Sequence, residues 1–298
     1  MKGEFLMNDY LIRGIDKSKS IRIFVATTTN MAEEARKIHN SSPTATAAIG
    51  RALTAGAIMG AMMKNEKDTL TLKISGGGPI GKILIVARNN GNVKGYVDFP
   101  QKDVPSREDG KLDVGGLVGK DGSVTVIMDL GLKDPYVGQS SLVSGEIAED
   151  LAHFYYTSEQ QPSAISLGVL VDKDISVKSA GGYIIQLLPG VSHEDITKIE
   201  STLANIEPVS TMIDKGLLPE EIMDRLLHDF EVEVLDKIQL NYKCDCSREK
   251  IEKVIISLGK KEIQDIIEED GQAEVVCHFC NSKYQFNKEE LSKFLLTE

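Results

Sequence analysis

All four cysteines of this 298-residue chain lie within its last 55 residues, in two close pairs. The stretch YKCDCSREK carries Cys244 and Cys246, and the stretch VVCHFCNSKY carries Cys277 and Cys280. The pattern is therefore C-x-C, a gap of 30 residues, then C-x-x-C. Four thiolates are the usual ligand count for tetrahedral zinc, and closely spaced pairs let one chain present two sulfurs to one metal. The spacing predicts a small C-terminal zinc-binding domain.

The zinc is expected to decide whether this tail folds. So short a segment has too small a hydrophobic core to fold stably by itself. In zinc-finger peptides, zinc binding contributes about 10–16 kcal/mol to the free energy of folding. His278, between Cys277 and Cys280, is an alternative ligand, but four cysteines already complete the shell.

The C-x-C half also has a redox consequence. Two residues of extended strand span about 6.6 Å, near the upper limit of the Cα separation in a disulfide. Pairing Cys244 with Cys246 would therefore bend the backbone away from its metal-binding shape. The spacing leaves two interpretations open. One is a permanent zinc ribbon; in the other, an oxidant pairs the neighbouring thiolates, expels the metal and destabilises the fold.

Length and composition bound the rest of the chain. With 298 residues we expect two domains, or a large body with a small tail. A net charge of -11 argues against nucleic acid as the main partner, because that affinity depends on clustered Lys and Arg. The N-terminus MKGEFLMNDYLIRG has no apolar run of signal-peptide length, so we expect a cytoplasmic chain with reduced thiols.

One segment, TATAAIGRALTAGAIMGAMM at residues 44–63, imitates a membrane span. It is almost continuously small and apolar and carries a G-x-x-x-G motif. Arg51 lies near its middle, however, and a central charge is costly in hydrocarbon. Ser42 followed by Pro43 is a good start for a helix in water. We therefore expect a buried helix, closely approached by its neighbours, and no membrane contact.

Up to residue 191 the pattern mixes strands and helices without regular βαβ alternation, which favours an α+β fold over a doubly wound sheet. The sequence NNGN predicts a tight hairpin between two of the strands. Helices are expected at 31–39, along the Ala-rich segment, and from about Ser144 in SGEIAEDLAHFYYTSEQ. Strands are expected in SIRIFVATTT, TLTLKIS, KILIVAR, VKGYVDF, SVTVIMDLG, AISLGVLVD and GGYIIQLLPG.

From Ser192 onward the residue pattern predicts helices. SHEDITKIESTLANI opens with Ser192 and Asp195 in capping-box-like spacing and keeps its Ile and Leu residues on one face. VSTMIDKG and LPEEIMDRLLHDF follow as short amphipathic helices, which must dock on something because they cannot be stable alone. FEVEVLDKIQLNYKC then alternates like a strand. We divide the chain into an α+β core at 1–191, a helical linker at 192–240 and a zinc domain at 241–298.

The other motifs support no catalytic or nucleotide site. Residues 76–82 (GGGPIGK) satisfy part of a P-loop, but Ile83 stands where Ser or Thr would hold Mg²⁺ and a strand follows in place of a helix. We interpret this segment as a Gly-rich turn between strands. The three carboxylates of GEIAED are interpreted as a solvated helix face. We expect no nucleotide cofactor and no enzyme activity.

Seven stretches together resemble the redox-regulated 33 kDa chaperonins, a family of heat-shock holdases. They cover nearly the whole chain in the family's order, and the mass of 32.6 kDa agrees. One departure is MKGEFL before MNDYLIRG, because the family begins close to the latter; we interpret these six residues as a difference in the start site or in the expressed sequence. The stretches are SPTATAAIGRALTAG, GGGPIG, VSGEIAEDLAHFYYTSEQQPSA, LGVLVD, AGGYIIQLLPG, CDCS and EVVCHFCNSKYQF.

The resemblance implies an ATP-independent cytoplasmic chaperone that binds unfolding proteins under oxidative and heat stress. It implies that Cys244, Cys246, Cys277 and Cys280 hold one zinc ion in the reduced, inactive form. Oxidation would pair Cys244 with Cys246 and Cys277 with Cys280, release zinc and unfold the zinc domain and the linker. Activated members of the family are also associated with homodimerisation through the core.

The client-binding surface is a separate hypothesis. A holdase benefits from covering its apolar surface until clients unfold, because constant exposure invites aggregation. We expect clients to bind the apolar faces of the linker together with the core surface that the linker covers. These faces include Met212, Ile213, Leu217, Ile222 and Leu226.

Two other functional classes remain as rivals. The C-x-x-C motif at 277–280 would suit a thiol–disulfide oxidoreductase if it lay at a strand-to-helix turn of a thioredoxin-like fold. A zinc-ribbon nucleic-acid module is disfavoured by the acidic balance of the chain.

Overall fold

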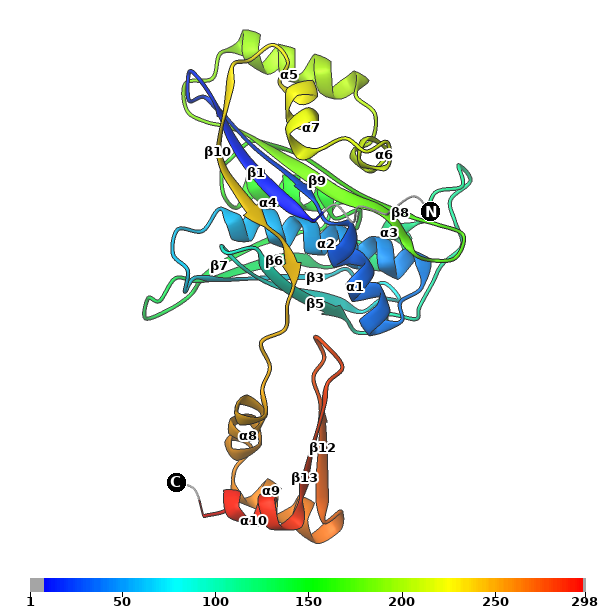
Figure 1. The fold of residues 1–298 in the computed structure, drawn as a ribbon, viewed down its shortest axis with the longest axis vertical. Coiled ribbons are helices and arrows are strands. Elements are labelled where there is room, and N and C mark those ends of the chain that lie inside the picture. Colours follow the sequence, from blue (N-terminus) through cyan, green and yellow to red (C-terminus); the bar gives the residue numbers. More distant parts are fainter. Residues whose placement is uncertain (1–7, 297–298) are drawn as a thin grey trace. The chain divides into compact units, whose positions relative to one another are not determined.

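The computed structural model describes residues 8–296, and these residues form two compact units that divide between Lys243 and Cys244 (Figure 1). Helices and strands are mixed in both units, as the α+β prediction requires. The N-terminal stretch MKGEFL lies outside the described residues. The three-part division into core, linker and zinc domain stays a prediction.

The first unit is built from two sheets with helix α2 (Pro43–Ala61) between them (Figure 1). One sheet has the strand order β10-β1-β2-β9-β8, and the other has the order β11-β5-β4-β3-β6-β7. The first sheet contains β1 (Tyr10–Asp16), β2 (Ile21–Thr27), β8 (Ser163–Val171), β9 (Val177–Leu187) and β10 (Val232–Gln239). The second contains β3 (Thr69–Ser75), β4 (Lys82–Arg88), β5 (Asn92–Val97), β6 (Ser123–Asp129), β7 (Tyr136–Ser141) and β11 (Asn241–Tyr242).

Helix α2 is the Ala-rich segment, and it is buried almost all round. Ser42 Oγ accepts a hydrogen bond from the backbone N–H of Ala45 and Pro43 occupies the first turn, so the helix begins as the sequence predicts. Its glycines allow close packing: a Cβ on Gly56 would come within 2.6 Å of Ile85 Cγ2. Arg51 ends in an ion pair with Glu146, with Nη1 and Oε2 2.6 Å apart. Among residues 8–296, none of the helices has the length and apolar composition of a membrane-spanning segment.

The remaining helices of the core are α1 (Thr29–His39), α3 (Val114–Val118) and α4 (Ala148–Thr157). Helix α4 begins four residues later than expected, because Ser144–Ile147 form a loop held by Asp150. The interpretation of GEIAED as a solvated face is wrong for Asp150, which is fully buried. Of residues 76–82, the first six form the predicted turn between β3 and β4, and Lys82 begins β4.

The linker segment, residues 192–240, is part of the first unit and packs on its first sheet. Helices α5 (His193–Asn205), α6 (Val209–Asp214) and α7 (Pro219–Leu226) lie over the face of the β1/β2/β9 sheet that points away from α2 (Figure 1). They share an apolar cluster with Ile12, Ile23 and Ile185 from the sheet. Strand β10 then pairs with β1 over its whole length, which fixes the end of the linker to the start of the core.

The second unit contains α8 (Arg248–Ser257), α9 (Lys260–Glu269), the hairpin β12 (Gln272–Val276) and β13 (Lys283–Asn287), and α10 (Lys288–Phe294). Its buried core is small and consists of Ile255, Ile263, Ile267, Phe286 and Leu291. A core of this size supplies little hydrophobic stabilisation, so the unit depends on further cross-links.

Candidate metal centre

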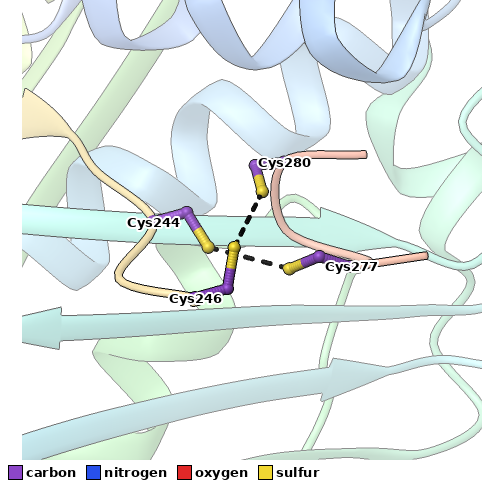
Figure 2. A group of neighbouring side chains, drawn as sticks. All are labelled: Cys244, Cys246, Cys277 and Cys280. Atoms are coloured by element: carbon purple, nitrogen blue, oxygen red, sulfur yellow. Dashed lines mark hydrogen bonds between the residues drawn. The ribbon is translucent and has the colours of Figure 1, made fainter. Parts of the chain in front are cut away.

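Two separate segments bring the four cysteines together at one end of the second unit. Cys244 and Cys246 lie in the stretch that leads into α8, and Cys277 and Cys280 lie in the turn between β12 and β13. Figure 2 shows the four side chains pointing toward one another. All four Sγ atoms lie within 4.8 Å of one another. The sulfurs of Cys244 and Cys277 lie 3.7 Å apart, and those of Cys246 and Cys280 lie 3.3 Å apart.

The turn that carries Cys277 and Cys280 is shaped by its own backbone. The Cys277 N–H donates to the carbonyl of Ser282, and the Asn281 N–H donates to the carbonyl of Cys277. Asn281 adopts a left-handed conformation with φ +56°, which Asn tolerates better than most residues. Pairing of Val276 with Lys283 closes the turn at its base. These backbone contacts shape the turn that presents Cys277 and Cys280 together.

These sulfurs fit a tetrahedral metal. A Zn–S bond of about 2.3 Å places tetrahedral sulfurs about 3.8 Å apart; two of the pairs here lie at 3.7 and 3.3 Å, and all lie within 4.8 Å. A set of four thiolates matches the soft ligands that zinc prefers. Among the described residues, no other group of His, Cys, Asp or Glu side chains has this arrangement, and His278 does not belong to it. The four cysteines could therefore hold a metal ion.

The thiols differ in their pKa values. Burial is the largest influence on Cys244 and raises its pKa well above the ordinary value, and burial raises the pKa of Cys277 as well. Burial is also the largest single influence on Cys280, but hydrogen bonds with Ser282, Cys246 and Cys244 together outweigh it and lower the pKa to about 7. The lowered pKa favours the thiolate of Cys280, which is the form that binds metal and attacks oxidants.

Polar neighbours support the sulfurs from outside. Tyr284 Oη donates to Cys246 Sγ over 3.1 Å, and this bond raises the Tyr284 pKa to about 12. Cys280 Sγ and Ser282 Oγ lie 3.2 Å apart. Donors aimed at a sulfur stabilise its thiolate and fix its orientation. Ser282 stands two residues after Cys280 in the sequence, whereas the approach of Tyr284 to Cys246, 38 residues away along the chain, exists only in the folded unit.

The other predicted site residues lie in the linker. Met212 and Ile213 on α6, and Ile222 and Leu226 on α7, are buried against the sheet, whereas Leu217 is half-buried. They belong to one apolar cluster. The C-x-x-C motif lies in a β-hairpin, so it lacks the strand-to-helix turn that an oxidoreductase of the thioredoxin type requires.

Comparison with known proteins shows which family this chain belongs to. The family model described as Hsp33 protein matches residues 9–287. A 33 kDa chaperonin of Alkaliphilus oremlandii is 51% identical over 287 residues, which cover 96% of each chain. A 33 kDa chaperonin of Clostridium botulinum is 47% identical over 289 residues, covering 97% of this chain and 98% of that one.

A solved structure agrees with these sequence matches. The 33 kDa chaperonin of Thermotoga maritima, a heat shock protein 33 homolog, gives a TM-score of 0.89 at 38% identity and covers 97% of this chain and 98% of its own. The names of these relatives describe chaperonins and no enzyme activity, in agreement with the expectation for this chain. The resemblance stated from the sequence is confirmed: the chain belongs to the Hsp33 family of heat shock chaperones.

Proposed function

We propose that this chaperone is an ATP-independent, redox-regulated holdase of the cytoplasm, inactive when its cysteines are reduced and hold zinc. The observation that carries the proposal is the convergence of four thiol sulfurs within 4.8 Å in a unit with a very small core. In such a unit, loss of the metal is loss of most of the folding free energy. The cysteines can therefore couple the oxidation state of the protein to the folding of its second unit.

Zinc would be held by Cys244, Cys246, Cys277 and Cys280, and would supply a cross-link between the segment before α8 and the β12/β13 hairpin. The small core of Ile255, Ile263, Ile267, Phe286 and Leu291 lies on the helices and strands that this cross-link joins. The ligand set favours zinc over harder cations, because thiolates are soft ligands.

Oxidation would remove the ligands. We propose the pairing that the family resemblance implies, Cys244 with Cys246 and Cys277 with Cys280. Each disulfide forms when two thiols lose two protons and two electrons to a peroxide, which is reduced to water. A low pKa at Cys280 supports the start of this step at the C-x-x-C pair, because the thiolate is the nucleophile. Neither disulfide leaves a thiolate free to bind metal.

Unfolding of the second unit would then act on the linker, residues 192–240. In the folded chain this segment covers one face of the β1/β2/β9 sheet with side chains that are mostly buried. We propose that the linker becomes mobile and that unfolding clients bind its apolar faces and the sheet surface beneath, through Met212, Ile213, Leu217, Ile222 and Leu226. Because these residues are covered in the docked state, binding there requires the linker to move. The active form is proposed to be a homodimer through the core.

The proposal is tested by light scattering from a heat-denatured client. Zinc-loaded reduced protein is compared with protein treated with peroxide at mildly elevated temperature, and then with the same protein after reduction. We expect only the oxidised form to suppress aggregation, with reversal by reductant. Equal suppression by both forms would mean that the cysteines form a permanent zinc site and that the switch must be withdrawn.

A further inference from the structure

A cavity of about 500 Å³ lies in the first unit, where the linker meets the core. One side is strand β8, from Ser166 to Val171, and another is the loop before α3, from Arg107 to Leu112. Residues 208–211, where α6 begins against β8, line a further side (Figure 1). The volume is within the range of pockets that hold small ligands. The cavity is therefore complete only while the start of α6 is docked.

Positive charge prevails in the lining of this cavity, which holds three cations and one carboxylate. The cations are Arg51 on α2 and, in the loop before α3, Arg107 and Lys111. The carboxylate is Glu146, with Oε2 2.6 Å from Arg51 Nη1 and Oε1 3.5 Å from Arg107 Nη1. Asp109, which is outside the lining, lies 3.5 Å from Lys111 Nζ and 3.9 Å from Arg107 Nε. The lining thus carries two net positive charges, and one remains when the second acid is counted.

The existing ion pairs leave donors for a bound anion. Glu146 is already shared between two arginines, and its Oε1 also accepts a hydrogen bond from the Gly115 N–H over 3.3 Å. Arg51 donates to Glu146 through Nη1, but its Nε is buried and has no acceptor among residues 8–296. A buried donor without an acceptor is costly, and a ligand oxygen would satisfy it. Arg107 and Lys111 are exposed, so their long ion pairs contribute little and can rearrange.

The chemistry of the lining favours a phosphate group joined to a carbon body. A phosphate monoester carries a charge of about −2 at neutral pH, which matches the two net charges of the lining. Guanidinium groups also pair with phosphate oxygens through their planar fork of donors. Beside the cations, Leu112, Leu167 and Val169 offer apolar surface, and Ser166 and Thr211 carry hydroxyls. These side chains suit the part of the ligand that is not phosphate.

We propose that this cavity binds a small phosphorylated metabolite, with its phosphate group on Arg51, Arg107 and Lys111 and its carbon body against β8. The site itself goes beyond the proposed function, whereas its effect on the chaperone rests on that function. Residues 208–211 belong to the linker, so the ligand binds the docked state more tightly than a state in which the linker is mobile. By linkage, the bound ligand stabilises the docked, inactive state.

Calorimetric titration of the full-length, reduced, zinc-loaded protein at constant ionic strength tests the site. The probes are phenyl phosphate, benzoate, which keeps the ring but has one charge, and inorganic phosphate, which has no carbon body. We expect one phenyl phosphate per chain, bound at least about tenfold more tightly than either of the other probes, because it alone offers both the second charge and the ring. Equal binding of benzoate would overturn the assignment to phosphate, and equal binding of inorganic phosphate would overturn the assignment to a metabolite.

Charge-matched variants decide the location. Arg107→Gln and Lys111→Gln each remove one positive charge from the lining and should weaken the binding of phenyl phosphate at least about fivefold. Arg88→Gln is the control, because Arg88 is exposed on β4 of the same unit and does not line the cavity. All three variants change the net charge of the chain equally, so only a local contact separates them. Equal affinities of the three variants would overturn the inference.

The effect on the linker has its own readout. Phenyl phosphate should slow hydrogen exchange in α6 of the reduced protein, and benzoate should not. Unchanged exchange in α6 at saturating phenyl phosphate would overturn the stabilisation of the docked state. Failure of the proposed function gives a different pattern: aggregation of the heat-denatured client does not depend on the redox state, while phenyl phosphate still binds the reduced protein and Arg107→Gln still weakens that binding.

Discussion

Asp150 illustrates how a single buried carboxylate organises the chain before α4. Its Oδ1 accepts hydrogen bonds from the backbone N–H groups of Val143, Ser144 and Gly145, and its Oδ2 accepts one from Ile147. Ile147 has φ +69°, an unfavourable conformation for a β-branched residue. The four hydrogen bonds both satisfy the buried charge and hold this strained turn, which carries Glu146 to its ion pair with Arg51.

Replacing Asp150 should therefore be strongly destabilising. Asp150→Ala leaves four backbone donors without their acceptor, and we expect the free energy of unfolding to fall by about 3–5 kcal/mol. Chemical denaturation monitored by circular dichroism measures the change. Glu149→Ala, at an exposed position of the same first turn, is the control and should cost less than about 0.5 kcal/mol. Equal stability of the two variants would contradict this role.

Asp9 predicts a pH dependence of stability. Its carboxylate accepts a hydrogen bond from the Met31 N–H at 2.7 Å, yet burial is the larger effect and raises its pKa from 3.8 to about 7. Because the folded pKa lies above the unfolded one, the native state binds the proton more tightly. The contribution is present in full below about pH 4 and is lost as the pH rises toward 7, by at most about 1.4 kcal/mol per pH unit.

The matched variant is Asp9→Asn, which keeps the shape and an acceptor but cannot ionise. Denaturant midpoints measured from pH 4 to pH 8 should show a smaller decline with pH for Asp9→Asn than for the unchanged protein. Parallel pH profiles for the two proteins would contradict the raised pKa.

Local sequence patterns predicted most of the strands and helices. The elements that they missed or misplaced depend on contacts between residues far apart in the chain. Ser42 and Pro43 fixed the start of α2, and NNGN fixed the β4–β5 hairpin. Strand β1 was not predicted, because its position in the middle of a sheet depends on pairing with β10 at the far end of the linker. The start of α4 was misplaced because a buried Asp150 cannot be told from an exposed one by its neighbours in sequence.

The cysteine cluster was predictable because each half of it is local. C-x-C and C-x-x-C spacings present paired sulfurs whatever surrounds them. The contact of Tyr284 with Cys246 was not predictable, since the two residues lie 38 positions apart in the chain and meet only in the folded unit.

Docking of the linker depends on the packing of α7 against the sheet, and this contact can be tested by mutation. Ile222 is fully buried in the cluster between α7 and the sheet. Ile222→Ala should lower the stability of docking by about 2–5 kcal/mol, because it removes buried methyl groups and leaves a cavity. Hydrogen exchange should quicken in α5, α6 and α7 while β2 and β9 stay protected. The exposed Asp224→Ala is the control, and exchange that is unchanged in Ile222→Ala would contradict the role of this contact.

For the whole molecule, the two units should respond differently to metal removal. The second unit has a core of five buried side chains and four converging thiols, whereas the first unit has an extensive core of its own. A strong zinc chelator under reducing conditions should unfold residues 244–296, make the linker at 192–240 mobile and leave residues 8–191 folded. Limited proteolysis should then remove the second unit and cut within the linker, so that the stable fragment ends before Lys243. A second unit that stays protease-resistant without metal would contradict this account.

The central claim is that oxidation of the cysteines, loss of zinc and chaperone activity are one event. The most direct measurement is a peroxide titration in which free thiols, zinc released to a colorimetric chelator and suppression of client aggregation are followed in the same samples. The account predicts three coincident curves, with two disulfides formed and one zinc ion released per chain at full activity. Full suppression of aggregation while zinc is still bound and all four thiols are still free would contradict it.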